Sequence, residues 1–339
     1  MKILVTGSAG FICGYAVADL LAAGHEVVGI DNFSKYGRVA KSYDGHPRYT
    51  LREGDCKDAA LLGRLAEGCD HILAAAAMIG GISYFHTHAY DLLAENERII
   101  AATFDAAIAA HKAGTLRKIT VLSSSMVFES ATQFPTPEGA ERACPPPRST
   151  YGFQKLACEY YAQGAREQYG LPFTILRPFN CVGVGEQKAL SGREVKSGNL
   201  SLAMSHVVPD LVAKVAKGQD PLRILGSGGQ VRHYTYGGDL ARGIRLGIEH
   251  PAALGEDFNL STATPHTVLE VAAAIWERFH PGEPLRVVSD APFEYDVQMR
   301  SPSVEKARRL LGFEATTPLS QILDEVVPWV KEQIQAGTL

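Results

Sequence analysis

Short apolar runs alternate along the chain with longer segments in which small and apolar residues recur every three or four positions. Six apolar runs are predicted to be strands: residues 2–6, 26–31, 49–53, 71–75, 118–123 and 173–177. Four intervening segments have the period of amphipathic helices: residues 12–23, 58–67, 90–113 and 151–169. This alternation predicts an α/β fold, a doubly wound parallel sheet of Rossmann type with helices on both faces.

The pattern loosens after residue 177, where the stretch 180–200 is rich in Gly, Lys and Ser. Further helices are predicted near residues 206–217, 239–249, 268–279 and 319–334, with a short strand near 223–225. We therefore expect residues 1–178 to form the Rossmann domain. Residues 179–339 are expected to form mainly a smaller C-terminal α/β lobe, with chain crossings back to the first domain.

Composition narrows the class of protein. The chain has 339 residues, 46% of them hydrophobic and 21% charged, which is typical of a globular protein. The formal net charge of -4 argues against nucleic acid as a partner. No apolar run has the length of a membrane span, and no leader-like segment precedes the first strand, so we expect a cytoplasmic protein without a membrane partner. The six cysteines lack metal-ligand spacing, which favours free thiols and no metal site.

A glycine-rich turn follows the first predicted strand. Gly7 and Gly10 lead into Phe11 and Ile12, which begin a predicted helix. Glycine lets a backbone approach a pyrophosphate closely, and the helix N-terminus presents free N–H groups to it. Asp31 ends the second predicted strand, where a carboxylate bonds ribose hydroxyls and repels a 2′-phosphate. The arrangement predicts a dinucleotide site that prefers NAD to NADP.

A second group of residues is suited to proton transfer. Tyr151 and Lys155 lie one turn apart on a predicted helix, so the ammonium and the phenol share a face. A neighbouring cation favours the phenolate and makes the tyrosine a better base near neutral pH. Ser124 and Ser125 follow the strand 118–123, where a serine hydroxyl can hold a substrate hydroxyl against the tyrosine.

These motifs together resemble the extended short-chain dehydrogenase/reductase family, in particular its nucleotide-sugar epimerases and dehydratases. The resemblance covers essentially the whole chain and includes TGSAGFI at the start, YGFQK at Tyr151, RPFNCVG at Arg177 and VRHYTYGGD at Val231. It implies bound NAD, a nucleoside diphosphate sugar as substrate, and a homodimer formed through the helices at 90–113 and 151–169.

The resemblance also implies roles for individual residues. The cofactor ligands would be Gly7, Gly10, Phe11, Ile12, Asp31, Asn32, Asp55, Cys56, Ala74, Ala75, Asn96, Tyr151 and Lys155. The substrate ligands would be Gly80, Gly81, Asn180, Arg232 and Arg300, with the two arginines clamping the diphosphate. One position departs from the family pattern: Cys13 stands where the third glycine of the loop is expected, and we expect a small shift to accommodate its thiol.

The two residues after Ser124 distinguish dehydration of a nucleotide sugar from its epimerisation. The 4,6-dehydratases that the chain resembles carry Asp-Glu where this chain has Ser125 and Met126, and neither of these is an acid or a base for the sugar carbons. We therefore expect a 4-epimerase that works by transient oxidation at C4 of a nucleoside diphosphate hexose.

Two alternatives remain. The stretch SHVVP at 205–209 resembles a segment of GDP-fucose synthases whose histidine is an acid/base, so His206 would make the chain a 3,5-epimerase or an atypical dehydratase. A non-catalytic NAD-binding regulatory protein is the alternative of another class.

Overall fold

The computed structural model describes residues 1–79, 88–186, 193–195, 198–200, 206–292 and 297–339. Its centre is a seven-stranded parallel sheet in the order β13-β6-β5-β4-β1-β2-β3. These strands are β1 (Lys2–Thr6), β2 (Glu26–Asp31), β3 (Tyr49–Glu53), β4 (His71–Ala74), β5 (Lys118–Leu122), β6 (Phe173–Pro178) and β13 (Asp257–Leu260). The predicted Rossmann-type α/β fold is confirmed.

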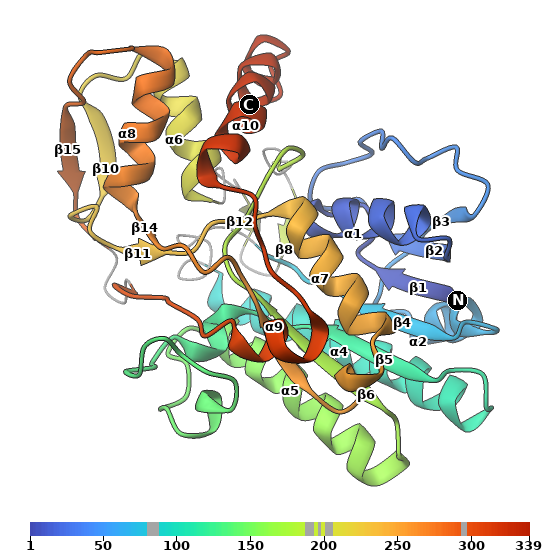
Figure 1. The fold of residues 1–339 in the computed structure, drawn as a ribbon. Coiled ribbons are helices and arrows are strands. Elements are labelled where there is room, and N and C mark those ends of the chain that lie inside the picture. The colour runs from blue at the N-terminus through green and yellow to red at the C-terminus, as the bar shows by residue number, and fades with distance from the viewer. Residues whose placement is uncertain (80–87, 187–192, 196–197, 201–205, 293–296) are drawn as a thin grey trace.

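Helices cover both faces of this sheet (Figure 1). On one face α1 (Phe11–Ala22) packs against α7 (Gly237–Glu249), and α9 (Glu305–Leu311) joins the same apolar core. On the other face lie α2 (Ala59–Ala66), α4 (Ala89–Lys112) and α5 (Thr150–Tyr169). The strands are buried between two helical layers, which explains why they read as continuous apolar runs rather than as alternating ones.

The chain crosses back to the main sheet after residue 178. Helix α7, which the sequence analysis placed with the smaller lobe, instead buries Leu240 and Ile244 against Val17 and Leu20 of α1. The strand β13 then pairs in parallel with β6 at the edge of the sheet. The sequence analysis missed β13, because a run of four residues carries little periodic signal and its partner lies about 80 positions earlier in the chain.

The smaller lobe has its own core. Three helices, α6 (Val207–Ala216), α8 (Val268–Phe279) and α10 (Leu319–Gln335), bury Val212, Ile275 and Val326 against one another. The strands β10 (Leu222–Leu225) and β15 (Val287–Asp290) form a parallel pair beside them (Figure 1). Thr267 begins α8 with a reciprocal capping box to Glu270, the arrangement that satisfies two otherwise unpaired N–H groups of a helix start.

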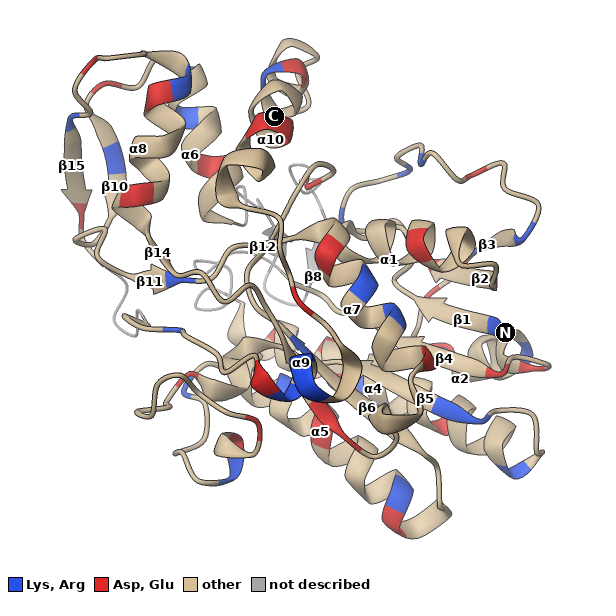
Figure 2. Cartoon of the chain, in the orientation of Figure 1, with Lys and Arg blue, Asp and Glu red and all other residues tan. Residues whose placement is uncertain are grey.

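The remaining described elements are short. They are the strands β7 (Cys181–Val182), β8 (Arg193–Val195), β9 (Gly198–Leu200), β11 (Val231–Arg232), β12 (Thr235–Tyr236) and β14 (His266–Thr267), and the 3₁₀ turns η1 (Ser125–Phe128), η2 (Ala140–Arg142) and η3 (Pro251–Ala253). The pairs β7–β12 and β11–β14 carry the chain between the lobes. Acidic and basic residues are interspersed along the ribbon (Figure 2). Over the described ranges, no helix combines the length and the apolar character needed to span a bilayer.

Candidate active site

A cavity of about 660 Å³ opens where the carboxyl ends of the strands meet the smaller lobe. The strand order reverses at β1, with β4 on one side of it and β2 on the other. Ligands of doubly wound sheets bind at such a reversal, because the loops after the two neighbouring strands diverge there and leave a crevice. Residues of β2, β5 and β7 and of α1, α5 and α6 line this cavity.

The glycine turn after β1 is shaped for close approach. Gly7 has φ +70°, and a Cβ on it would lie 2.8 Å from the Cα of Ala76, so both the conformation and the space require glycine. Thr6 Oγ1 accepts hydrogen bonds from the backbone N–H groups of Ala75 and Ala76, each at 3.0 Å, which fixes the loop after β4 beside this turn. Gly10 precedes α1 without a side-chain cap, so the N-terminus of the helix faces the cavity.

Asp31 is held at the end of β2 by the backbone. Its two carboxylate oxygens accept hydrogen bonds from Ala9 N at 3.0 Å and Phe33 N at 2.7 Å. Burial raises the pKa of Asp31, while these two hydrogen bonds oppose the rise. The carboxylate therefore has a fixed orientation at the rim of the cavity. Cys13 is buried in α1 with its Sγ 3.9 Å from Thr6 O, so its thiol is accommodated between α1 and β1.

Helix α5 begins beside the end of β5. Ser149 caps the helix by accepting a hydrogen bond from Gly152 N at 3.0 Å, and Glu129 accepts from both the N–H and the hydroxyl of Ser149 at 2.9 Å. A Cβ on Gly152 would lie 2.6 Å from Pro147 Cβ and 2.8 Å from the carbonyl oxygen of Met126. This close approach brings the first turn of α5 onto η1, the segment that follows Ser124.

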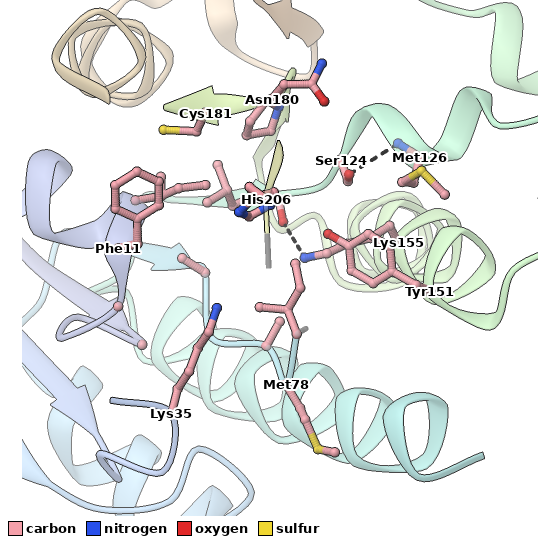
Figure 3. A pocket seen from close by; sticks show the side chains of 18 of the residues that line it. Phe11, Lys35, Met78, Ser124, Met126, Tyr151, Lys155, Asn180, Cys181 and His206 are labelled. Atoms are coloured by element: carbon pink, nitrogen blue, oxygen red, sulfur yellow. Dashed lines mark hydrogen bonds between the residues drawn. The ribbon is translucent and has the colours of Figure 1, made fainter. Parts of the chain in front are cut away.

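Tyr151, Lys155 and Ser124 meet at this junction (Figure 3). Lys155 Nζ donates a hydrogen bond to Leu122 O at 3.0 Å and lies 6.0 Å from the centre of the Tyr151 ring. Ser124 Oγ accepts a hydrogen bond from Met126 N at 3.2 Å, which leaves its own proton available to a ligand. The three side chains are buried in the protein and border the cavity, an arrangement suited to proton transfer away from bulk water.

The surroundings of the phenol are apolar. Tyr151 packs with Leu92 and Met126, and Met78 and Ile79 flank the cluster. Met126 accepts a hydrogen bond at its sulfur from Arg300 Nη2 at 2.8 Å. A thioether exchanges no proton, so the position after Ser125 contributes shape and not acid/base chemistry.

The backbone of residues 231–233 connects the substrate residues that are predicted for the smaller lobe. Val231 N donates to Gln298 O at 2.9 Å and Arg300 N donates to Val231 O at 3.2 Å, which places Arg300 beside Arg232. On the other side of the segment, Asn180 Nδ2 donates to His233 O at 3.4 Å. Asn180, Arg232 and Arg300 all line the cavity.

His206 precedes α6 and borders the same cavity (Figure 3). Its Nδ1 is hydrogen-bonded to a carboxylate oxygen of Glu186, and the Glu186 side chain is only 3% exposed. The carboxylate orients the imidazole. The sequence analysis missed Glu186, because it lies in an irregular turn and 20 residues separate it from His206.

Most of the predicted site residues line this single cavity: Gly7, Gly10, Phe11, Ile12, Asp31, Asn32, Asp55, Cys56, Ala75, Ser124, Ser125, Tyr151, Lys155, Asn180, His206, Arg232 and Arg300. Ala74 and Asn96 are not among its lining residues. Asn96 is buried and exchanges two hydrogen bonds with the backbone of Met78, at 2.7 and 2.9 Å, so it positions the loop after β4. Gly80 and Gly81 lie outside the described residues.

Asp31 at the end of β2 and the Tyr151/Lys155 helix border the cavity that the glycine turn also lines. This arrangement is typical of dinucleotide-dependent enzymes of the short-chain dehydrogenase/reductase type. The model of the NAD dependent epimerase/dehydratase family matches residues 3–261. The chain belongs to this family, and its cofactor is NAD.

Known proteins resemble the chain along nearly its full length. The UDP-glucose 4-epimerase of Halalkalibacterium halodurans is 29% identical over 351 residues, which cover 98% of this chain and 96% of that protein. The crystal structure of UDP-glucose 4-epimerase from Thermotoga maritima with UDP-glucose is 25% identical, with a TM-score of 0.79, and the match covers 98% of this chain and 100% of that one. The fold is also shared with a dTDP-glucose 4,6-dehydratase from Streptomyces venezuelae, at 23% identity, a TM-score of 0.84, and 99% and 98% coverage.

Proposed function

We propose that the chain is a nucleotide-sugar 4-epimerase that acts through transient oxidation at C4 of a nucleoside diphosphate hexose. The observation that carries the proposal is the meeting of Ser124, Tyr151 and Lys155 in the cavity that the dinucleotide turn also lines. Inversion at C4 needs only a hydroxyl ligand and a reversible proton acceptor beside the cofactor. Full-length similarity to UDP-glucose 4-epimerases supports this reaction and makes UDP-hexoses the first substrates to test.

The chain's own residues move one proton in each direction. Ser124 donates a hydrogen bond to the C4 oxygen of the sugar, and Tyr151 Oη accepts the proton of that hydroxyl. Lys155, held by Leu122 O, places its ammonium beside the phenol and stabilises the phenolate. When bound between the Gly7 turn and Asp31, NAD supplies reversible hydride transfer at the sugar carbon. Return of the proton from Tyr151 to the C4 oxygen gives the hydroxyl of the opposite epimer and completes the inversion.

The smaller lobe holds the rest of the substrate. Arg232 and Arg300 border the cavity, and guanidinium groups bind diphosphate oxygens with paired N–H donors. Asn180 lies next to them at the end of β6. Binding energy from the diphosphate anchors the sugar while its 4-keto form turns to present the other face.

The outer faces of α4 and α5 are proposed to form a homodimer interface. The helices lie side by side (Figure 1), and Tyr90, Phe153 and Tyr160 are exposed on them, Tyr160 by 63%. Exposed aromatic groups on adjacent helices are typical of an interface. Light scattering after size exclusion should give a dimer for the wild type and a monomer for Tyr160→Glu; a wild-type monomer at micromolar concentration contradicts the proposal.

The hydrogen bond between His206 and Glu186 favours a second candidate, epimerisation at C3 or C5. A histidine oriented by a buried carboxylate is suited to exchange a carbon-bound proton of a 4-keto sugar. We rank this reaction second, because Ser125 and Met126 offer no partner acid or base.

One experiment tests the proposed function directly. The purified protein is incubated with UDP-, dTDP-, GDP- and CDP-hexoses, the sugars are analysed by NMR, and absorbance of the reduced nicotinamide is recorded. We expect interconversion of one pair of C4 epimers, lost in Tyr151→Phe. If no nucleotide sugar is converted and none reduces the bound cofactor, the proposal is wrong and a non-catalytic NAD-binding protein is favoured.

A further inference from the structure

The phenol of Tyr234 is buried at the cavity without a hydrogen-bond partner. Tyr234 lies between β11 and β12 and is 4% exposed. It lines the cavity, and its hydroxyl oxygen is covered yet makes no hydrogen bond within the described part of the chain. Burial of a hydroxyl without a hydrogen-bond partner is unfavourable in free energy, because its hydrogen bonds to water are lost and no others replace them.

The backbone fixes the direction of this side chain. Successive side chains of an extended segment point to opposite sides, so Arg232 and Tyr234 face the cavity and His233 points away from it. His233 is anchored on that other side, with Nδ1 2.9 Å from Thr262 O and Nε2 3.0 Å from Ser301 Oγ. Thr235 N donates to Asn180 O at 3.1 Å and holds the segment against β7. Rotation of Tyr234 toward another partner would require this anchored segment to move.

The electrostatic surroundings indicate what is missing. Burial raises the pKa of Tyr234 to about 12, although the cationic Arg232 and Arg300 lower it, so the hydroxyl keeps its proton at neutral pH. Guanidinium groups are donors only, so neither arginine can accept that proton. The phenol and the two guanidinium groups all line the cavity and carry hydrogen-bond donors, and the phenol has no acceptor within the described residues.

We propose that Tyr234 Oη donates a hydrogen bond to a diphosphate oxygen of the substrate, between Arg232 and Arg300. This inference rests on the proposed function, which requires a nucleoside diphosphate in the cavity. It adds a neutral hydrogen-bond donor to the two cations. A directional hydrogen bond constrains the orientation of the diphosphate, which attraction to the two positive charges alone leaves free. Nothing in the sequence singles out this tyrosine, because neither its burial nor its orphaned hydroxyl is visible before the fold is known.

The test is the variant Tyr234→Phe in the NAD-bound protein, with Tyr43→Phe as its matched control. Tyr43 also carries a buried hydroxyl without a partner in the described structure, but it does not line the cavity. Calorimetry measures the affinity of whichever of UDP, dTDP, GDP and CDP binds most tightly. The affinity of the matching nucleoside, which lacks the diphosphate, is measured by competition and compared with it.

We expect Tyr234→Phe to weaken binding of the diphosphate by roughly 5- to 100-fold and to leave binding of the nucleoside unchanged. The variant should also melt at or above the wild-type temperature, because no internal hydrogen bond is lost, whereas a purely structural tyrosine would lower it. Tyr43→Phe should leave both affinities unchanged.

Three results overturn the inference. Diphosphate affinity of Tyr234→Phe within twofold of wild type shows that the phenol makes no such contact. An equal loss for diphosphate and nucleoside places the phenol on the ribose or the base. A wild-type protein that binds none of the four diphosphates overturns the proposed function, and this inference with it; the first two results leave the proposed function intact.

Discussion

Arg177 and Glu159 form a buried, two-point ion pair between β6 and the catalytic helix α5. Arg177 Nε lies 2.8 Å from Glu159 Oε1, Nη2 lies 2.7 Å from Oε2, and each side chain is 1% exposed. Ser123 Oγ donates to the same carboxylate at 2.6 Å, and Arg177 Nη1 reaches Asp257 of β13 at 2.6 Å. Glu159 is one turn beyond Lys155, so the ion pair joins β6 to the helix that carries Tyr151. The hydrogen bond from Ser123 joins the same carboxylate to the segment that precedes Ser124.

Removing one partner of this pair should be severely destabilising. We expect Arg177→Met to lower the free energy of unfolding by about 3–5 kcal/mol, because it leaves the Glu159 carboxylate buried without its cation. Chemical denaturation measures the loss. The control is Arg286→Met, whose ion pair with Asp220 is exposed and which should leave the melting temperature unchanged. Equal losses in the two variants would show that burial of the pair is unimportant.

The sequence predicted the parts of the fold that depend on local pattern. The bounds of β1, β2 and β3 are as predicted, and α1, α4 and α5 agree within about two residues. The place of α7 against α1 and the existence of β13 were not predicted. Both depend on contacts between distant segments, and amphipathic periodicity identifies an apolar face without identifying what covers it.

The same distinction between local pattern and distant contacts applies to the candidate site. Motifs continuous in sequence, such as the Gly7 turn and the Tyr151/Lys155 helix, were identified from their spacing. Glu186 and Tyr234 were missed, because they matter only through neighbours that the fold brings to them. Asn96 was assigned to the cofactor by resemblance, yet its side chain is engaged by Met78, a contact that no sequence pattern reports.

Asp31 should determine the choice of dinucleotide. Ala9 and Phe33 hold its carboxylate toward the cavity, where a 2′-phosphate would meet a second negative charge. We expect the wild type to bind NAD at least about tenfold more tightly than NADP, and Asp31→Ser to reduce that ratio mainly by weakening NAD. Calorimetry with both dinucleotides measures the ratio. Equal affinities in the wild type would remove this role from Asp31.

Tyr151 should be required for turnover and dispensable for binding. Tyr151→Phe removes only the transferable proton, so we expect activity to fall by about 10²–10⁴-fold while NAD stays bound. Lys155→Met should weaken both turnover and NAD binding, because it removes the cation that supports the phenolate and, by family resemblance, a ligand of the nicotinamide ribose. Retention of more than about a tenth of wild-type activity by Tyr151→Phe would rule out its role as the proton acceptor.

Lys118 should make stability depend on pH. Its buried ammonium donates a hydrogen bond to Gly247 O at 2.8 Å. Burial lowers the pKa of Lys118 to about 8, whereas an unfolded lysine titrates near 10.4. Between about pH 8 and 10.4 the unfolded chain binds more protons than the folded protein, so the destabilisation caused by Lys118 decreases as the pH rises. Below about pH 8 Lys118 is protonated in both states, and its destabilisation is constant.

The variant Lys118→Met isolates this effect. We expect it to increase the free energy of unfolding at pH 7 by about 1–3 kcal/mol and to lose that advantage near pH 10, where folded Lys118 is neutral. Urea unfolding at both pH values gives the free energy of unfolding of the wild type and of the variant. Taking the difference between the two proteins at each pH cancels the contribution of all other titrating groups. An advantage independent of pH would mean that folding does not lower the pKa of Lys118.

Which carbon is inverted can be decided by following protons at the sugar. Inversion at C4 by return of the same hydride exchanges no carbon-bound proton with solvent, whereas inversion at C3 or C5 must, because an enolate forms beside the 4-keto group. Ser125 and Met126 cannot mediate that exchange, so His206, oriented by Glu186, is the remaining candidate among the predicted catalytic residues. We therefore expect turnover in D₂O to leave C3 and C5 unlabelled, as measured by NMR and mass spectrometry. His206→Asn should then raise KM more than it lowers kcat, because the side chain contacts bound substrate without exchanging a proton. Deuterium at C3 or C5 that disappears in His206→Asn, and is reduced in Glu186→Gln, would reverse the ranking of the two reactions and identify His206 as the acid/base of a 3,5-epimerase.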